Sequence, residues 1–197
     1  MMPGILLLAA GHGERYQAAG GGGEKLMAVQ AQHANRPLFA VVLEQAIASG
    51  LDVHVVTRPG NDGVRALAGE RGIALTVIES GGMGESIAAG VQATAHWCGW
   101  LIQPADMPQI TAADYQMVAR ALQTHSQARP QWQGQPGHPV GFSERWRSAL
   151  CQLHDDKGAR TLLNHELILL PGHAGVIVDQ DLPISSPDDF CVPPHPP

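Results

Sequence analysis

Residues 4–25 of the chain read GILLLAAGHGERYQAAGGGGEK. The first six form a short, continuously apolar run between Pro3 and a glycine-rich stretch, which is the pattern of a strand buried on both faces. Strands of that kind belong to parallel sheets. The glycines that follow let the backbone approach an anion, and Arg15 and Lys25 supply cations. The stretch therefore predicts a cradle for a nucleotide triphosphate at the end of a parallel strand.

Two well-known phosphate-binding loops do not fit this stretch. A G-x-G-x-x-G dinucleotide fingerprint would need glycine where the chain has Tyr16, and a Walker A loop would need Ser or Thr where Leu26 follows Lys25. The alternative to a phosphate cradle is a flexible surface loop whose glycines act as a linker.

The order of elements after the loop indicates the fold class. A helix with Pro37 at its start and Gly50 at its end precedes an apolar strand at 53–57. The alternation continues with a helix at 61–69, a strand at 73–78, a helix at 85–96, a strand at 99–103 and a helix at 112–123, and short strands are expected at 139–142 and 176–178. Strands that alternate with helices imply right-handed βαβ crossovers. We expect an α/β, Rossmann-like, doubly wound and mostly parallel sheet in a single domain at 1–190, followed by a Pro-rich tail at 191–197.

Composition excludes several classes of protein. The 197 residues are 44% hydrophobic and 15% charged, which is too little charge for a disordered acidic chain or a coiled coil. Twelve Lys and Arg against 18 Asp and Glu give a net charge of −6, so a nucleic acid is not expected as the partner. Three cysteines without metal or disulfide spacing, and the lack of a secretion or membrane segment, favour a cytoplasmic location.

The first loop resembles that of a known family. Leu8-Ala9-Ala10-Gly11, Arg15 and Lys25 are similar to the L-A-A-G-x-x-x-R-x-G-x-x-K motif of nucleotidyltransferases that attach a nucleotide to molybdopterin, in particular the molybdenum cofactor cytidylyltransferases. In this chain residues 17–23 lengthen the interval between the arginine and the lysine. The resemblance implies a fold like that of nucleotide-diphospho-sugar transferases, with Arg15 and Lys25 catalytic. It also implies nucleotide contacts by Leu8, Ala9, Ala10, Gly11, His12, Gly13 and Lys25.

A second glycine-rich segment, at 81–87, lies between a predicted strand and a predicted helix. Amides at a helix N-terminus favour negative or polar groups, although glycines there also suit a plain tight turn. The segment resembles the family's G-G-M-x-x-S motif, which lies beside the base and ribose. The resemblance adds Gly82, Met83 and Ser86 to the expected nucleotide contacts.

Asp106 lies between Pro104 and Pro108, directly after a predicted buried strand. A carboxylate at that edge of the sheet can hold Mg²⁺ that bridges triphosphate oxygens, and the alternative is a solvated aspartate before a helix cap at Thr111. The segment resembles the family's G-D-M-P metal motif, with Ala105 in place of glycine. The family's second acidic motif is broken here, so Asp179 or Asp181 could supply a second metal ligand, and we take Asp181 as the candidate.

Two later segments, at 137–142 and 155–160, are similar to the family's G-H-P-V-x-F strand and G-D-x-G-A-R turn, with Asp155 where glycine is usual. Lys157 and Arg160 could hold a terminal phosphate or a pterin edge, and an acidic helix cap is the alternative interpretation. By resemblance these segments shape the acceptor site. The expected acceptor contacts are His138, Asp156, Lys157, Gly158 and Arg160.

These features together predict a Mg²⁺-dependent nucleotidyltransferase. An NTP would donate its nucleotide to a phosphate-bearing acceptor and release pyrophosphate, mainly by positioning and charge neutralisation. The resemblance implies molybdopterin as acceptor, CTP as the favoured donor because the loop reads L-A-A-G, and a molybdoenzyme or its chaperone as a possible partner. A sugar- or polyol-phosphate nucleotidyltransferase and a non-catalytic nucleotide- or molybdopterin-binding protein are the alternatives.

Overall fold

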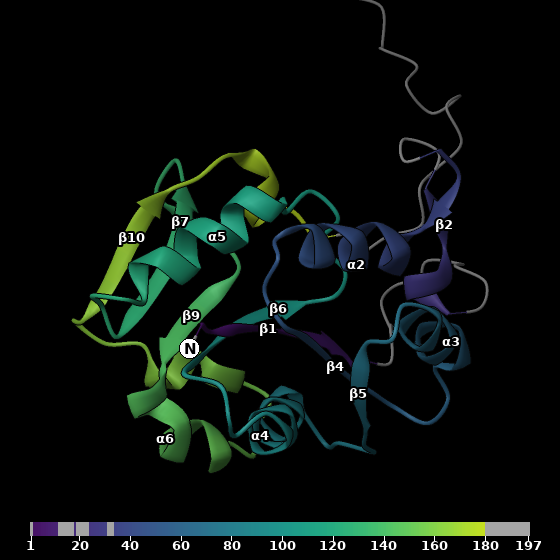
Figure 1. Ribbon diagram of the computed structural model, residues 1–197, viewed down its shortest axis with the longest axis horizontal. Coiled ribbons are helices and arrows are strands. Elements are labelled where there is room, and N and C mark those ends of the chain that lie inside the picture. Colours follow the sequence, from purple (N-terminus) through teal and green to yellow (C-terminus); the bar gives the residue numbers. More distant parts are fainter. Residues whose placement is uncertain (1, 12–17, 19–23, 31–33, 180–197) are drawn as a thin grey trace, which may run out of the picture.

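The computed structural model describes residues 2–11, 18, 24–30 and 34–179. Its centre is an eight-stranded sheet in the order β10-β7-β9-β6-β1-β4-β5, with β8 paired to β7 (Figure 1). The strands are β1 (Gly4–Ala9), β4 (Val53–Thr57), β5 (Ala74–Val77), β6 (Gly99–Pro104), β7 (Gln127–Trp132), β8 (Gln135–Pro136), β9 (Val140–Ser143) and β10 (Leu167–Pro171). A separate pair, β2 (Val29–Gln30) and β3 (Arg36–Pro37), is antiparallel. The expectation of a mostly parallel α/β sheet is confirmed, because β9 and the short β8 alone run against the others in the described sheet.

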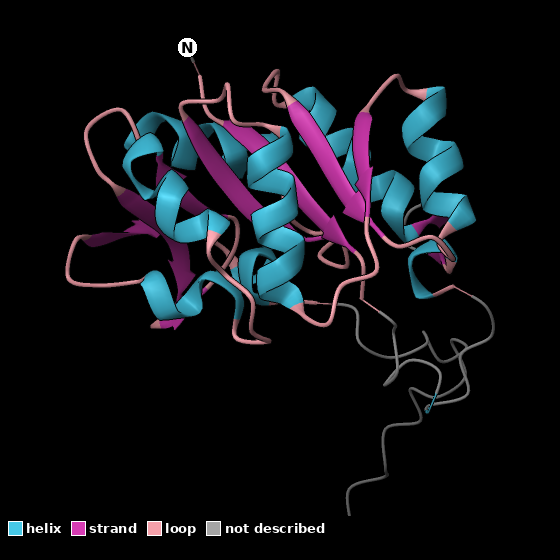
Figure 2. Cartoon of the chain, turned by 90° about the horizontal axis from the view of Figure 1, so that it is seen from below, coloured by secondary structure: helices cyan, strands magenta, loops and turns pink. Residues whose placement is uncertain are grey.

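Helices cover both faces of the sheet (Figures 1 and 2). The α-helices are α2 (Leu38–Ala48), α3 (Asp62–Glu70), α4 (Met83–Ala93), α5 (Ala112–Ala121) and α6 (Arg147–Cys151). The 3-10 turns are η1 (Lys25–Met27), η3 (Glu144–Trp146), η4 (Gly158–Leu162) and η5 (Ala174–Ile177). Helices α2, α3 and α5 pack on one face, whereas α4 and α6 pack on the other. None of the helices in the described part of the chain combines the length and the apolar character that crossing a membrane requires.

Strand β1 shows why the apolar N-terminal run lies at the centre of the sheet. Ile5 and Leu7 point into the core beneath α2, and Leu6 points into the core beneath α4. All three are 0% exposed, because consecutive residues of a strand point to opposite faces and helices cover both faces of this sheet. Because β4 and β6 flank β1 in parallel register, the carboxyl ends of all three strands meet at one edge of the sheet.

Two predictions about the second half of the chain need correction. The strand expected at 176–178 is wrong, because residues 174–177 form the 3-10 turn η5, in which the Gly175 N–H donates to Nδ1 of His173 at 3.1 Å. The stretch at 127–139 has no clear hydrophobic period, yet it forms β7 and β8, and β10 pairs with β7 in parallel. Pro130 interrupts the apolar pattern of β7, so periodicity alone did not indicate the strand.

Candidate active site

A cavity of about 370 Å³ opens at the carboxyl ends of β1, β4 and β6, next to the N-terminus of α4. Ligands of open α/β sheets bind at this edge. The cavity is lined by Leu8, Ala9, Ala10, Gly11, Glu24, Lys25, Leu26, Arg58, Asn61, Ser80, Gly81, Gly82, Met83, Ser86, Pro104, Ala105, Asp106 and Asp156. The structure thus brings the described part of the first loop, the second glycine-rich segment and the predicted metal aspartate to one place.

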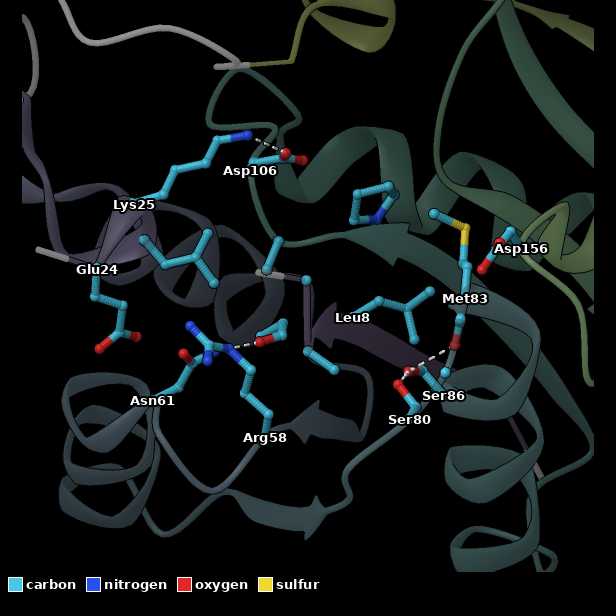
Figure 3. A pocket seen from close by; sticks show the side chains of 18 residues that line it. Leu8, Glu24, Lys25, Arg58, Asn61, Ser80, Met83, Ser86, Asp106 and Asp156 are labelled. Atoms are coloured by element: carbon cyan, nitrogen blue, oxygen red, sulfur yellow. Dashed lines mark hydrogen bonds and ion pairs between the residues drawn. The ribbon is translucent and has the colours of Figure 1, made fainter. Parts of the chain in front are cut away.

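Lys25 and Asp106, which are 81 residues apart in the sequence, meet at this cavity (Figure 3). The Nζ of Lys25 donates to Oδ2 of Asp106 at 2.7 Å, and their side chains are 12% and 22% exposed. Partial burial makes an ion pair of this kind stronger than one on the open surface. The pair places one cation and one carboxylate where a triphosphate and its metal would need them.

A backbone contact beside Asp106 explains its position at this edge of the sheet. The N–H of the buried Ala105 donates to the carbonyl of Leu8 at 2.9 Å, which joins the end of β6 to the end of β1. The Oδ1 of Asp106 is buried and has no hydrogen-bond partner. A buried carboxylate oxygen without a donor is suited to a cation. Within the described residues no three His, Cys, Asp or Glu side chains gather into a metal-binding group, so Asp106 would hold a metal together with substrate phosphates and water.

The 3-10 turn η1 fixes Lys25 against the start of α3. The preceding Glu24 accepts from the backbone amides of Gly63 and Val64, and Met27 covers Gly63 so closely that a Cβ there would lie 2.5 Å from the Met27 Cγ. Burial raises the pKa of Glu24 above its ordinary value, and the two amides and Arg58 oppose that shift.

Sequence reasoning missed four polar residues of the cavity, namely Glu24, Arg58, Asn61 and Ser80. The Nδ2 of Asn61 donates to the carbonyl of Ala9 at 2.6 Å, and Thr57 Oγ1 donates to the same oxygen at 3.3 Å. Asn61 is 1% exposed, and its Oδ1 is buried without a partner. Arg58 and Asn61 follow β4 at the same sheet edge as the first loop, and that position was the available signal. Arg58 and Asn61 belong to no recognisable sequence motif, so they were not identified from the sequence.

The second glycine-rich segment and the 155–158 turn are packed directly together. The Gly84 N–H donates to the carbonyl of Asp155 at 2.8 Å, and a Cβ on Gly84 would lie 2.6 Å from that oxygen. A Cβ on Gly82 would collide with Oδ1 of Asp156. Both glycines are therefore required by the close approach of the two turns. Asp156, which was expected among the acceptor contacts, lines this first cavity through the same contact.

The opposite wall of the cavity carries hydroxyl groups. Ser80 and Ser86 share a hydrogen bond of 2.8 Å between their Oγ atoms, and Ser86 also donates to the carbonyl of Gly82. Figure 3 shows Leu8 between this pair and the Lys25–Asp106 pair. An elongated ligand above Leu8 would therefore have hydroxyl groups at one end and the ion pair at the other.

A second cavity of about 150 Å³ adjoins the first, and the two share Leu8, Met83 and Pro104 as lining residues. It is lined by Leu8, Met83, Ile87, Ile102, Pro104, Arg129, His138, Val140, Lys157, Ala159, Arg160 and Leu163. The structure places His138, Lys157 and Arg160 here, as expected for residues of one site. Gly158, with φ at +58°, packs against Met83 and allows the turn between Lys157 and η4.

Burial keeps the second cavity's histidine neutral. Desolvation lowers the pKa of His138 to about 4, and the positive charge of Arg129 contributes to the same shift. Arg129 itself has a lowered pKa, because it is desolvated and lies near the charge of Arg160. Arg129 was not predicted from the sequence, since its strand was not.

Four predicted residues lie outside the described part of the chain. They are His12, Gly13, Arg15 and Asp181. Their assignments to nucleotide binding, catalysis and metal binding stay predictions. Asp179, the other candidate for a second metal ligand, is the last described residue of the chain and is exposed.

Comparisons with solved structures agree with the fold. The fold is similar to that of Rv0371c from Mycobacterium tuberculosis H37Rv, with a TM-score of 0.77, 21% identity and 96% of each chain covered. The structure of Rv0371c in complex with manganese gives a TM-score of 0.72, 19% identity and the same coverage. The 4-diphosphocytidyl-2C-methyl-D-erythritol synthase from Anaerococcus prevotii DSM 20548 gives 0.66 and 13%, with 89% of this chain and 91% of that chain covered.

A search of curated protein sequences found no match. Residues 5–169, however, match the sequence profile of a family described as the MobA-like NTP transferase domain. The matched range runs from β1 into β10 and includes both cavities. The chain therefore belongs to the family of MobA-like NTP transferase domains and is a nucleotidyltransferase.

Proposed function

We propose that this nucleotidyltransferase moves a nucleotide, CMP by preference, from an NTP to a molybdopterin-type acceptor in the presence of Mg²⁺. An oxygen of the acceptor phosphate attacks the α-phosphorus and forms a new P–O bond. The bond between the α-phosphorus and the bridging oxygen breaks, and pyrophosphate leaves with that electron pair. The attacking phosphate oxygen is already deprotonated, so the step needs positioning and charge neutralisation rather than a general base.

The pairing of Lys25 with Asp106 at 2.7 Å is the observation that carries this proposal. The pair lies beside the backbone of residues 8–11 in a cavity large enough for a nucleotide. Lys25 can neutralise triphosphate oxygens, because its ammonium is a compact point charge on a flexible stem. As Lys25 turns to the triphosphate, Asp106 is left to face a metal.

The donor set is compatible with Mg²⁺. One carboxylate with a buried and unpartnered oxygen, next to a phosphate-binding loop, matches the way Mg²⁺ is commonly bound by one or two carboxylates plus substrate phosphates. The manganese complex of Rv0371c supports divalent metal use in this fold. When bound, Mg²⁺ would neutralise phosphate charge as a Lewis acid.

The preference for CTP rests on the L-A-A-G loop, and the choice of molybdopterin rests on the resemblance to the molybdopterin nucleotidyltransferases, in which the 137–142 and 155–160 segments shape the acceptor site. The second cavity supports an acceptor that carries a phosphate, because its polar lining is cationic. A shared wall between the cavities is what a direct transfer between two bound substrates requires.

Pyrophosphate release tests the proposal. Purified protein is incubated with Mg²⁺ and each of CTP, GTP, ATP and UTP, with molybdopterin present or absent and with a sugar phosphate as the alternative acceptor. We expect release that depends on molybdopterin and is fastest with CTP. Turnover with GTP and none with CTP would overturn the donor, turnover with the sugar phosphate alone would overturn the acceptor, and saturable binding without release would indicate a non-catalytic carrier.

A further inference from the structure

The charged residues that line the second cavity are all cations, whereas carboxylates and cations both line the first cavity. Arg129, Lys157 and Arg160 line it, and none of its lining residues is a carboxylate. Its other walls are mostly apolar, with His138 kept neutral by burial. Three cations in a partly apolar cavity repel one another unless an anion joins them.

Arg129 is the half-buried member of this group, whereas Lys157 and Arg160 are exposed. Its Nε–H donates to the carbonyl of Gly137 at 2.9 Å, which holds the guanidinium near His138. Within the described residues, Arg129 and Arg160 have no carboxylate partner, although other arginines of the chain such as Arg145 and Arg147 have one. A desolvated arginine without a counter-charge is costly, so its retention in a cavity indicates a ligand that supplies the charge.

We propose that Arg129, together with Arg160, binds the phosphate monoester of the acceptor and selects acceptors that carry a dianionic phosphate. This inference rests on the proposed function, since it names the group that the second cavity holds for transfer. The guanidinium fork suits a phosphate because it can donate two parallel hydrogen bonds to two oxygens. The Nε of Arg129 is occupied by Gly137, which leaves its terminal nitrogens for the ligand.

The position of Arg129 also solves an electrostatic difficulty of the reaction. Transfer requires an anionic phosphate to approach the anionic α-phosphate of the NTP, and these charges repel each other. Because the two cavities share Leu8, Met83 and Pro104, an anion held by Arg129 would lie next to the nucleotide site. Arginines beside the acceptor phosphate neutralise part of its charge before the two substrates meet.

A structural role is the competing explanation for Arg129. In that case the guanidinium serves only to hold the Gly137 carbonyl and therefore the strand that begins at Val140. Removing Arg129 would then lower stability without changing any response to phosphate. The two explanations differ in a ligand-dependent readout, which the experiment uses.

The experiment compares wild type with Arg129→Gln, Arg129→Lys and Arg160→Gln. Arg145→Gln is the matched control, since it removes an exposed arginine that pairs with Glu166. The first measurement is the melting temperature against inorganic phosphate at constant ionic strength, with chloride as reference. We expect phosphate to stabilise wild type and the control, to act weakly on Arg129→Lys, and to have little effect on Arg129→Gln or Arg160→Gln.

The second measurement is steady-state transfer with whichever phosphomonoester, molybdopterin or sugar phosphate, supports turnover. We expect the acceptor KM to rise about 10- to 100-fold in Arg129→Gln while the CTP KM stays within about twofold. If Arg129→Gln does not fold, Arg160→Gln decides the outcome in its place, because its side chain is exposed.

Two outcomes separate this inference from the proposed function. An equal phosphate response in wild type, Arg129→Gln and Arg160→Gln, with unchanged acceptor KM, overturns the inference even if transfer is observed. A phosphate response that depends on Arg129, without transfer to any acceptor tested, supports the phosphate site and overturns the proposed function alone.

Discussion

The two cavities share a wall but differ in how their charges are balanced. In the nucleotide cavity Lys25 and Asp106 form an ion pair at 2.7 Å, whereas in the second cavity Arg129 and Arg160 face no carboxylate among the residues that the structure describes. A balanced pair can be separated by a ligand that brings both an anion and a cation, which describes a triphosphate with its metal. An unbalanced group needs an anion alone. The charges of the two neighbouring cavities therefore favour different ligands, a metal-bound triphosphate in the first and an anion in the second.

The largest effect is expected when the Lys25–Asp106 pair is broken by replacing Asp106. Asp106→Asn keeps the size of the side chain but removes the charge, so we expect turnover to fall at least about 10²- to 10³-fold with the fold intact. Pyrophosphate release measures turnover, and circular dichroism checks the fold. Asp52→Asn, at an exposed aspartate, is the control. Near-normal metal-dependent turnover in Asp106→Asn would show that the metal is held elsewhere.

The next largest effect is expected when the same pair is broken by replacing Lys25. Lys25→Gln removes a charge from the triphosphate site, and we expect CTP to bind about 10- to 100-fold more weakly. Titration calorimetry with CTP and Mg²⁺ measures the affinity, and Arg65→Gln removes an exposed cation as control. The same variant should bind Mn²⁺ more tightly than wild type in the absence of nucleotide, since Asp106 no longer has its ammonium partner. Equal CTP affinity in the two proteins would contradict the role of Lys25.

The same contrast shows what could be predicted from the sequence. Residues that follow apolar strands, such as Gly11 and Asp106, were placed at the nucleotide cavity because parallel strands end at one edge of a sheet. Arg129 was not placed, because Pro130 and polar neighbours hide the periodicity of β7. The strand β10 (Leu167–Pro171) was not predicted either, and its parallel pairing with β7 depends on long-range contacts that no local pattern encodes. The charge of each cavity likewise could not be predicted, because its lining residues lie far apart in the sequence and meet only in the fold.

A smaller effect tests the contact that joins the two cavities. Gly84→Ala places a methyl group 2.6 Å from the Asp155 carbonyl, so the 155–158 turn must shift, and we expect a loss of about 1–3 kcal/mol in the free energy of unfolding. Gly69→Ala is the matched control, because it lies in α3 with open space at its Cβ and should gain roughly 0.4–1 kcal/mol. Urea unfolding measures both. Equal stability of the two variants would mean that the turns are not tightly packed.

The smallest effect concerns the pH dependence of the unbalanced cavity. The pKa of His138 is lowered to about 4 from an ordinary value of 6.5, so the unfolded chain binds this proton more readily than the folded chain. The histidine's contribution to stability is therefore complete above about pH 6.5 and is lost as the pH falls toward 4. Between pH 7 and pH 5 we expect the stability difference between wild type and His138→Gln to change by about 1–2 kcal/mol in favour of the variant.

Urea unfolding at the two pH values measures this change, and His165→Gln removes an exposed imidazole as control. The charge of Arg129 contributes to the lowered pKa, so phosphate bound there should weaken the effect by offsetting that charge. Adding phosphate at constant ionic strength should therefore reduce the difference between wild type and His138→Gln at pH 5. If the stability difference between wild type and His138→Gln stays constant from pH 7 to pH 5, His138 is solvated. The second cavity would then lack the desolvation that makes an unpaired arginine costly, and its arginines would not require a bound anion.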